Sequence, residues 1–152
     1  MDRNELLRAK KKALNWLTDR DRSVYELTEK LKKAEFSDEV VEETLSYVKS
    51  FGYLDDDKYA RHYIEFYSQS RSRQRIRFDL IKKGVDKECI ERAFDSFESY
   101  DEKELIRHLI EKKSRTVRLD GSDRDTKIIQ SLARKGFSVG EIRSVLDEMK
   151  SE

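Results

Sequence analysis

Four arginines at alternate positions are the strongest candidates for recognition chemistry in this chain. They are Arg71, Arg73, Arg75 and Arg77. A guanidinium group binds a phosphate or a carboxylate through two parallel hydrogen bonds, which a lysine ammonium group cannot do. Alternate positions on a helix spread around its surface instead of forming one stripe. The pattern therefore predicts a basic surface for an anionic partner, and the alternative is an ordinary mixture of solvated charges.

Lysines and aromatic residues extend this candidate surface. Phe78 is aromatic where the equivalent positions of the repeats described below are polar, so it either covers a neighbouring element or anchors a partner. Tyr59, Tyr63 and Tyr67 precede the arginines at helical spacing, and they either pack as one face or stack on unpaired bases. The remaining candidate contact residues are Lys82, Lys83, Lys10, Lys11 and Lys12.

Catalytic and metal-binding patterns are missing from the sequence. His62 and His108 have no partner at a metal-ligand spacing, and the single cysteine, Cys89, fits a small helix residue better than a nucleophile. The three acids at residues 55–57 need only helix capping and the helix dipole to explain them. No phosphate-binding loop, dinucleotide turn or protease motif occurs. We therefore predict no enzyme activity, no metal and no cofactor.

Composition limits the partner and the location. Charged residues make up 43% of the 152 residues, yet the formal net charge is only +1, so a nucleic-acid role can rest only on a local concentration of charge. A single cysteine excludes an internal disulfide. No apolar run approaches the ~20 residues of a membrane span, and no signal-peptide pattern begins the chain. We expect a cytoplasmic protein that does not associate with membranes.

The elements that must position these residues follow a repeat. Apolar residues at i and i+4, then after a short turn at i, i+4 and i+7, recur from Leu27, from Ile76 and from Ile128, at offsets of 49 and 52 residues. Such spacing is one face of each of two helices, and a further helix precedes each pair. A period of this size is typical of helical repeat proteins. We predict an all-α tandem array of three three-helix repeats, residues 1–54, 55–100 and 101–152, forming an elongated, curved molecule.

Polar residues and glycines predict the helix ends. Ser23 and Glu26 form a capping-box pattern. Helix starts are also predicted at Ser37, Ser72, Asp86, Asp101 and Ser138, and helix ends at Gly52, Gly84 and Gly136. The first repeat has Glu35 where the others have Gly84 and Gly136, which predicts a different turn there. Residues 118–123 are predicted to form a loop.

Two motifs carry a resemblance to a known family. The first is Phe51-Gly52-Tyr53-Leu54-Asp55-Asp56, followed by Tyr59-Ala60 and Tyr63-Ile64. The second is Ser70-Arg71-Ser72-Arg73, then Arg75-Ile76-Arg77-x2-Leu80-x2-Lys83-Gly84-Val85. With these motifs the chain resembles the RecX family of recombination regulators over nearly its whole length. It departs from the family pattern in lacking a glycine-rich turn before Ile76 and in having Asp79 instead of glutamate.

The resemblance implies a non-catalytic, negative regulator of homologous recombination. Members of the family bind in the groove of the RecA–DNA filament and inhibit the ATPase and strand-exchange activities of RecA. The implied partners are the RecA filament and single-stranded or filament-bound DNA, and a monomer is expected. We assign the contacts to the arginines, Phe78 and the lysines named above.

Two other functions remain open from the residues alone. One is a helical-repeat docking scaffold for another protein. The other is a helix-turn-helix DNA-binding protein, with helices at residues 23–33 and 37–50 joined by a short turn. Asp38 and Glu39 begin the second of these helices, and phosphates would repel them.

Overall fold

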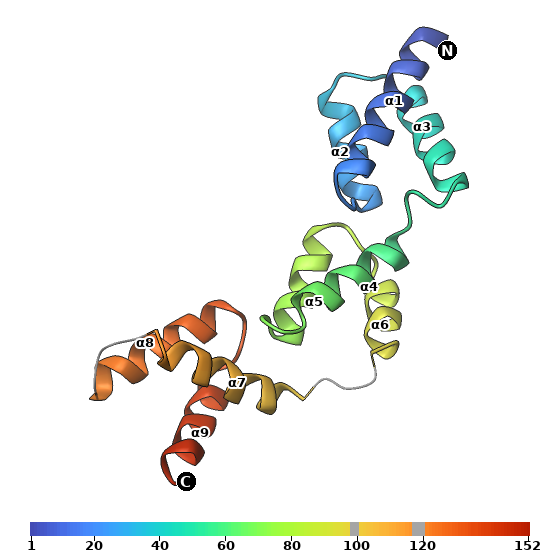
Figure 1. The fold of residues 1–152 in the computed structure, drawn as a ribbon. Helices are drawn as coiled ribbons and strands as arrows, with labels where there is room; N and C mark the ends of the chain where they lie inside the picture. Colours follow the sequence, from blue (N-terminus) through green and yellow to red (C-terminus); the bar gives the residue numbers. More distant parts are fainter. Residues whose placement is uncertain (98–100, 117–120) are drawn as a thin grey trace. The chain divides into compact units, whose positions relative to one another are not determined.

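Nine α-helices and no strand occur in residues 1–97, 101–116 and 121–152, the parts of the chain that the computed structural model describes (Figure 1). The predicted all-α class is therefore confirmed. The helices are α1 (Arg3–Asp19), α2 (Val24–Lys33), α3 (Asp38–Ser50), α4 (Asp56–Tyr67), α5 (Arg73–Lys82), α6 (Lys87–Asp95), α7 (Glu102–Ser114), α8 (Gly121–Arg134) and α9 (Val139–Lys150).

Side chains cap most helix starts as the sequence predicts. Ser23 and Glu26 form the complete capping box, in which the Glu26 N–H donates to Ser23 Oγ and the Ser23 N–H donates to Glu26 Oε1, each at 3.1 Å. Single side-chain caps of this kind begin α3, α7 and α9. Asp86 lies at the start of α6 in the expected extended conformation, but its side chain makes no capping hydrogen bond. Its position was predicted correctly and its hydrogen bond was not.

Glycines with a left-handed backbone end three of the helices. Gly52, Gly84 and Gly136 have φ values of 74°, 79° and 97°. In each case the next residue donates its N–H back to the carbonyl five residues earlier, as in the Schellman motif. The different turn predicted at Glu35 is wrong, because Glu35 has φ 66° and Phe36 donates to the Leu31 carbonyl in the same way. Glu35 is exposed, so its Cβ has room there.

The loop predicted at residues 118–123 needs correction. Residues 118–120 lie outside the described residues, and residues 121–123 already belong to α8. Asp123 lies in the first turn of α8, where an acid interacts favourably with the helix dipole. Residues that look like a loop by composition therefore serve as a helix start.

The chain divides into two compact units. Unit 1 contains residues 1–63 and 80–96, and unit 2 contains residues 64–79 and 97–152. The boundary passes through α4 and through α5, so the middle repeat contributes to both units. In unit 1, α3 packs against α1 and α2 around a core that includes Ala9, Ala13, Leu27, Leu31 and Val48.

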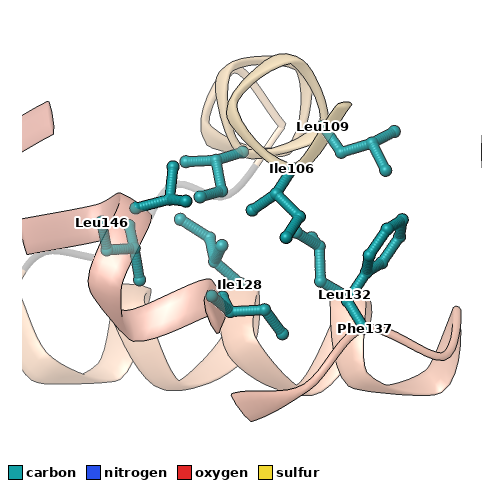
Figure 2. Packing of buried hydrophobic residues seen from close by; sticks show 9 residues of the cluster. Ile106, Leu109, Ile128, Leu132, Phe137 and Leu146 are labelled. Carbon is teal, nitrogen blue, oxygen red and sulfur yellow. The ribbon is translucent and has the colours of Figure 1, made fainter. Parts of the chain in front are cut away.

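The core of unit 2 lies between α7, α8 and α9. Ile106 of α7 points toward Ile128 and Leu132 of α8, with Leu146 of α9 beside them (Figure 2). All four side chains are buried. Burial of each such side chain contributes about 1.5–3 kcal/mol, so the repeated apolar positions account for the packing of this three-helix domain. None of the helices in the described ranges is both long enough and apolar enough to span a membrane.

Candidate functional site

Two of the four arginines bind one internal acid. Arg71 donates from a terminal guanidinium nitrogen to Asp79 Oδ2 at 2.7 Å, and Arg75 donates from Nε to Asp79 Oδ1 at 3.0 Å. Asp79 is buried, with 9% of its surface exposed. A buried carboxylate requires such partners because burial without them would be strongly unfavourable. Arg71 and Arg75 therefore have a structural role within unit 2.

The start of α5 is joined to the end of α8. Arg75 donates to the Arg134 carbonyl at 2.7 Å, and the Ser72 N–H donates to the Lys135 carbonyl at 3.0 Å. Unsatisfied carbonyls at a helix end thus meet N–H groups at a helix start, which satisfies both and aligns opposite ends of the two helix dipoles. Gly136 completes the joint, since a Cβ there would lie 2.4 Å from both Ser72 Oγ and Arg75 Cβ.

A joint of the same kind occurs in unit 1. Ser23 Oγ donates to the Lys83 carbonyl at 2.6 Å, and a Cβ on Gly84 would lie 2.4 Å from Tyr25 Cβ. Lys83 Nζ also bonds Glu26 Oε2 at 3.3 Å. The start of the middle helix of one repeat therefore packs against the glycine-marked end of the middle helix of the next repeat, once in each unit. We call these two contacts the serine–glycine joints.

Two carboxylates at the unit 1 joint have shifted pKa values of opposite sign. Burial raises the pKa of Glu26, but the Ser23 N–H and the charge of Lys83 outweigh it, so the pKa lies below its usual value. Burial also raises the pKa of Asp56, and there it outweighs the hydrogen bond from the Val24 N–H, so the pKa lies above its usual value. The joint thus holds one carboxylate that favours ionisation and one that resists it.

The other predicted contact residues differ in exposure and in their contacts within the protein. Phe78 is 54% exposed, Lys82 is exposed and Arg77 is partly buried. The backbone N–H of Arg73 donates to Glu102 Oε1 at 2.7 Å. On α1, Lys10 Nζ lies 4.3 Å from the centre of the Tyr47 ring. Lys11 and Lys12 are exposed on the same helix.

The tyrosines of α4 are occupied by contacts within the protein. Tyr59 is buried, and burial followed by the charge of Glu26 raises the pKa of its hydroxyl above the usual value. Tyr63 stacks on Tyr59 with 6.1 Å between ring centres, and the Arg71 guanidinium lies 3.7 Å from the Tyr67 ring centre. The packed-face interpretation is therefore the one that the structure supports. The most exposed aromatic ring of this helix is Phe66, at 75%.

The residues that could suggest catalysis have structural contacts instead. Cys89 Sγ donates to Asp57 Oδ1 at 3.0 Å. Burial first, and then this carboxylate, raise the pKa of the thiol to about 12, so it stays protonated and unreactive at neutral pH. His62 Nδ1 lies 2.6 Å from Asp21 Oδ2. Among the described residues, no group of three or more histidines, cysteines and acids is arranged to hold a metal ion.

The helix-turn-helix interpretation finds little support in the surface of α3. Its first two turns expose four carboxylates, which would repel the phosphates of a duplex. They belong to Asp38, Glu39, Glu42 and Glu43.

A basic groove in unit 2 was missed from the sequence. It consists of two adjoining surface cavities of about 410 and 280 Å³, which share Ser70, Ser131 and Lys135. Its basic lining comprises Arg71, Arg75, Lys112, Lys113, Arg134 and Lys135. The repeat offset of 52 residues contained a signal, because Arg134 and Lys135 are the equivalents of the candidates Lys82 and Lys83.

Comparison with known proteins agrees with this architecture. Three family models match successive parts of the chain: the first three-helix domain of RecX at residues 9–47, the second at 55–93 and the third at 100–146. A "Regulatory protein RecX" of Caldanaerobacter subterraneus subsp. tengcongensis is 34% identical over 94% of this chain and 71% of the relative. A protein of the same name from Streptomyces coelicolor is 31% identical over 96% and 81%.

A solved structure shares the fold. The crystal structure of RecX from Lactobacillus salivarius superposes with a TM-score of 0.75 at 24% identity, covering 98% of this chain and 99% of that chain. The three matched domains follow one another in order over most of the sequence. This chain belongs to the RecX family.

Proposed function

We propose that this chain binds the RecA–DNA filament and inhibits the ATPase and strand-exchange activities of RecA, as a negative regulator of homologous recombination. The observation that carries the proposal is the match of all three RecX domains in order. The relatives that share this arrangement are named regulatory proteins. A non-catalytic monomer acting in the cytoplasm without a cofactor fits this role. A tandem array of three-helix repeats would suit a partner that is itself a long helical assembly.

We propose contact residues on α5 and, as a separate set, on α1. On α5, Phe78 is an exposed aromatic ring beside Arg77 and Lys82, and on α1 the basic side chains are Lys10, Lys11 and Lys12. Aromatic residues and arginine are enriched at protein interfaces, where a few side chains dominate the binding energy. Arg71, Arg75 and Lys83 remain proposed contacts, although their side chains have internal hydrogen bonds that a partner would have to share. Arg73 also remains a proposed contact, and its backbone N–H donates to Glu102.

DNA-dependent ATP hydrolysis by RecA tests the proposal. Addition of this protein at up to equimolar amounts should lower the rate, and loss of the Phe78 ring should weaken the effect. A buried aromatic anchor contributes about 2 kcal/mol or more, so we expect Phe78→Ala to raise the half-inhibitory concentration about thirtyfold. Phe51→Ala is the matched control, because Phe51 has a similar exposure of 58% but lies outside the proposed surface.

Two outcomes of this experiment would contradict the proposal. An unchanged ATPase rate with the natural protein would reject filament regulation altogether. Equal inhibition by the natural protein and Phe78→Ala would reject the α5 surface. Charge reversal of Arg75 is unsuitable for this test, because Arg75 also bonds Asp79 and the Arg134 carbonyl and its loss would disturb unit 2.

A further inference from the structure

The basic groove of unit 2 brings together cations from α7, from the end of α8 and from the segment around the start of α5. Six lysines and arginines line its two cavities, and the described lining residues include no aspartate or glutamate. Arg71 and Arg75 bond the buried Asp79. The side chains of Lys112, Lys113, Arg134 and Lys135 form no ion pair within residues 1–97, 101–116 and 121–152.

Three other cations of the same domain are paired with acids. Lys103 pairs with Glu148 at 2.9 Å, Arg107 pairs with Glu152 at 2.7 Å, and Lys150 pairs with Asp125. Acids are therefore available on this three-helix domain, but they neutralise cations outside the groove. Like charges held close together repel one another, and an anionic ligand removes this repulsion.

An exposed aromatic ring adjoins the groove. Tyr67 lines the larger cavity, and its ring meets the Phe66 ring edge-on at 4.8 Å between centres. Phe66 is 75% exposed, more than any other large apolar side chain in the part of the chain that the structure describes. A cationic groove beside an exposed ring is the arrangement that binds unpaired nucleotides, because the cations take the phosphates and the ring stacks on a base.

We propose that the basic groove binds the backbone of single-stranded nucleic acid, with phosphates in its two cavities and one base stacked on Phe66. Serine hydroxyls shared by both cavities, Ser70 and Ser131, supply neutral donors between the cations. A duplex offers no unpaired base to Phe66, and an acidic protein segment would leave the ring unused. This inference deepens the proposed function by giving the DNA of the filament its own site, in residues of the third repeat and the adjoining part of the second.

Binding of a fluorescein-labelled oligothymidylate of about 15 nucleotides, followed by fluorescence anisotropy, tests the groove. RecA is left out, so the result does not depend on the proposed filament regulation. Arg134→Glu with Lys135→Glu should weaken binding at least tenfold and lower the steepness of log K against log salt by roughly 1 or more. Phe66→Ala should weaken binding about tenfold with little change in the salt dependence, because stacking contributes about 1–3 kcal/mol per base.

A matched control has the same change of charge elsewhere in unit 2. Lys127→Glu with Arg143→Glu replaces two exposed cations of α8 and α9 that do not line the groove, and it should change the affinity less than about threefold. Circular dichroism melting curves of all variants identify any that unfold. If the groove variant unfolds, Arg134→Gln or Lys135→Gln is used in its place, and the expected loss of affinity for the oligothymidylate is then smaller.

Three outcomes would overturn the inference. The first is equal oligothymidylate binding by the groove variant and its control. The second is competition by polyglutamate as strong as competition by the oligonucleotide, which would identify a general acidic-partner site. The third is tighter binding of duplex than of single strand together with no effect of Phe66→Ala.

Discussion

The glycines of this chain differ in backbone conformation and in the space available for a Cβ, and alanine substitution should therefore change stability by different amounts. Gly140 lies within α9 with free space around it, and Gly52 has φ 74° with free space. Gly136 has φ 97°, and a Cβ there would lie 2.4 Å from side-chain atoms of Ser72 and Arg75. A left-handed backbone alone disfavours an L side chain by about 1–2 kcal/mol. Overpacking adds about 1–3 kcal/mol.

We therefore expect an ordered series of alanine variants. Gly140→Ala should raise the free energy of unfolding by up to about 1 kcal/mol, Gly52→Ala should lower it by about 1–2 kcal/mol, and Gly136→Ala should lower it by roughly 2–5 kcal/mol. Urea unfolding followed by circular dichroism measures all three. A Gly136→Ala variant no less stable than Gly52→Ala would mean that the joint at Gly136 is not tightly packed.

Among the elements, α2 and the helices that it meets in unit 1 should respond to pH in two opposite ways. The lowered pKa of Glu26 gives stability that is present above its ordinary value of 4.5 and is lost as the pH falls through the folded-state pKa. The raised pKa of Asp56 has the opposite sign: its contribution is present below the ordinary value of 3.8 and is lost as the pH rises through the folded-state pKa.

Glu26→Gln and Asp56→Asn separate these contributions. The stability difference between the natural protein and Glu26→Gln should be greatest near neutral pH and should shrink below pH 4.5. As the pH falls, the free energy of unfolding of the natural protein should rise relative to that of Asp56→Asn. Urea unfolding between about pH 3 and 7 gives both trends. Parallel pH profiles for the two variants would contradict the assignment of opposite shifts.

The helices were largely predictable, because apolar spacing, caps and glycines act over a few residues. The local sequence alone marks a helix start at Ser23 with Glu26 and helix ends at Gly84 and Gly136. The pairing of Arg71 and Arg75 with Asp79 was not predictable in the same way, because the arginines looked like an outward surface and burial of Asp79 is a property of the packed unit. The basic groove required the packing of α7 and α8 to bring their cations to adjoining cavities, although the repeat offset did point to those at the end of α8.

For the whole molecule, the division of the middle repeat between two units has a consequence for truncation. In a chain ending at residue 97, the start of α5 would lose three partners that belong to unit 2: the Lys135 carbonyl, the Arg134 carbonyl and the Glu102 carboxylate. We expect the amides at residues 72–76 to exchange with deuterium at least tenfold faster than in the full chain.

Hydrogen exchange followed by mass spectrometry measures this effect, and the amides of α1 to α3 provide the internal control. Their core, which includes Leu27 and Leu31, lies wholly in unit 1, so their protection should be nearly unchanged. Protection of residues 72–76 that survives the truncation would mean that α5 is stable without the third repeat.

The serine–glycine joints also make the array directional. Each joint has two unlike halves, a serine at a helix start and a glycine at a helix end, so a repeat can be added only in one orientation. The middle repeat carries both halves, Ser72 and Gly84, and a duplicate of it could be inserted to lengthen the protein. A duplicate of the first repeat would instead place Glu35 in the joint, where its Cβ would collide with the preceding helix. The absence of a Cβ at Gly84 thus allows the middle repeat to be duplicated, whereas the Cβ of Glu35 prevents this for the first repeat.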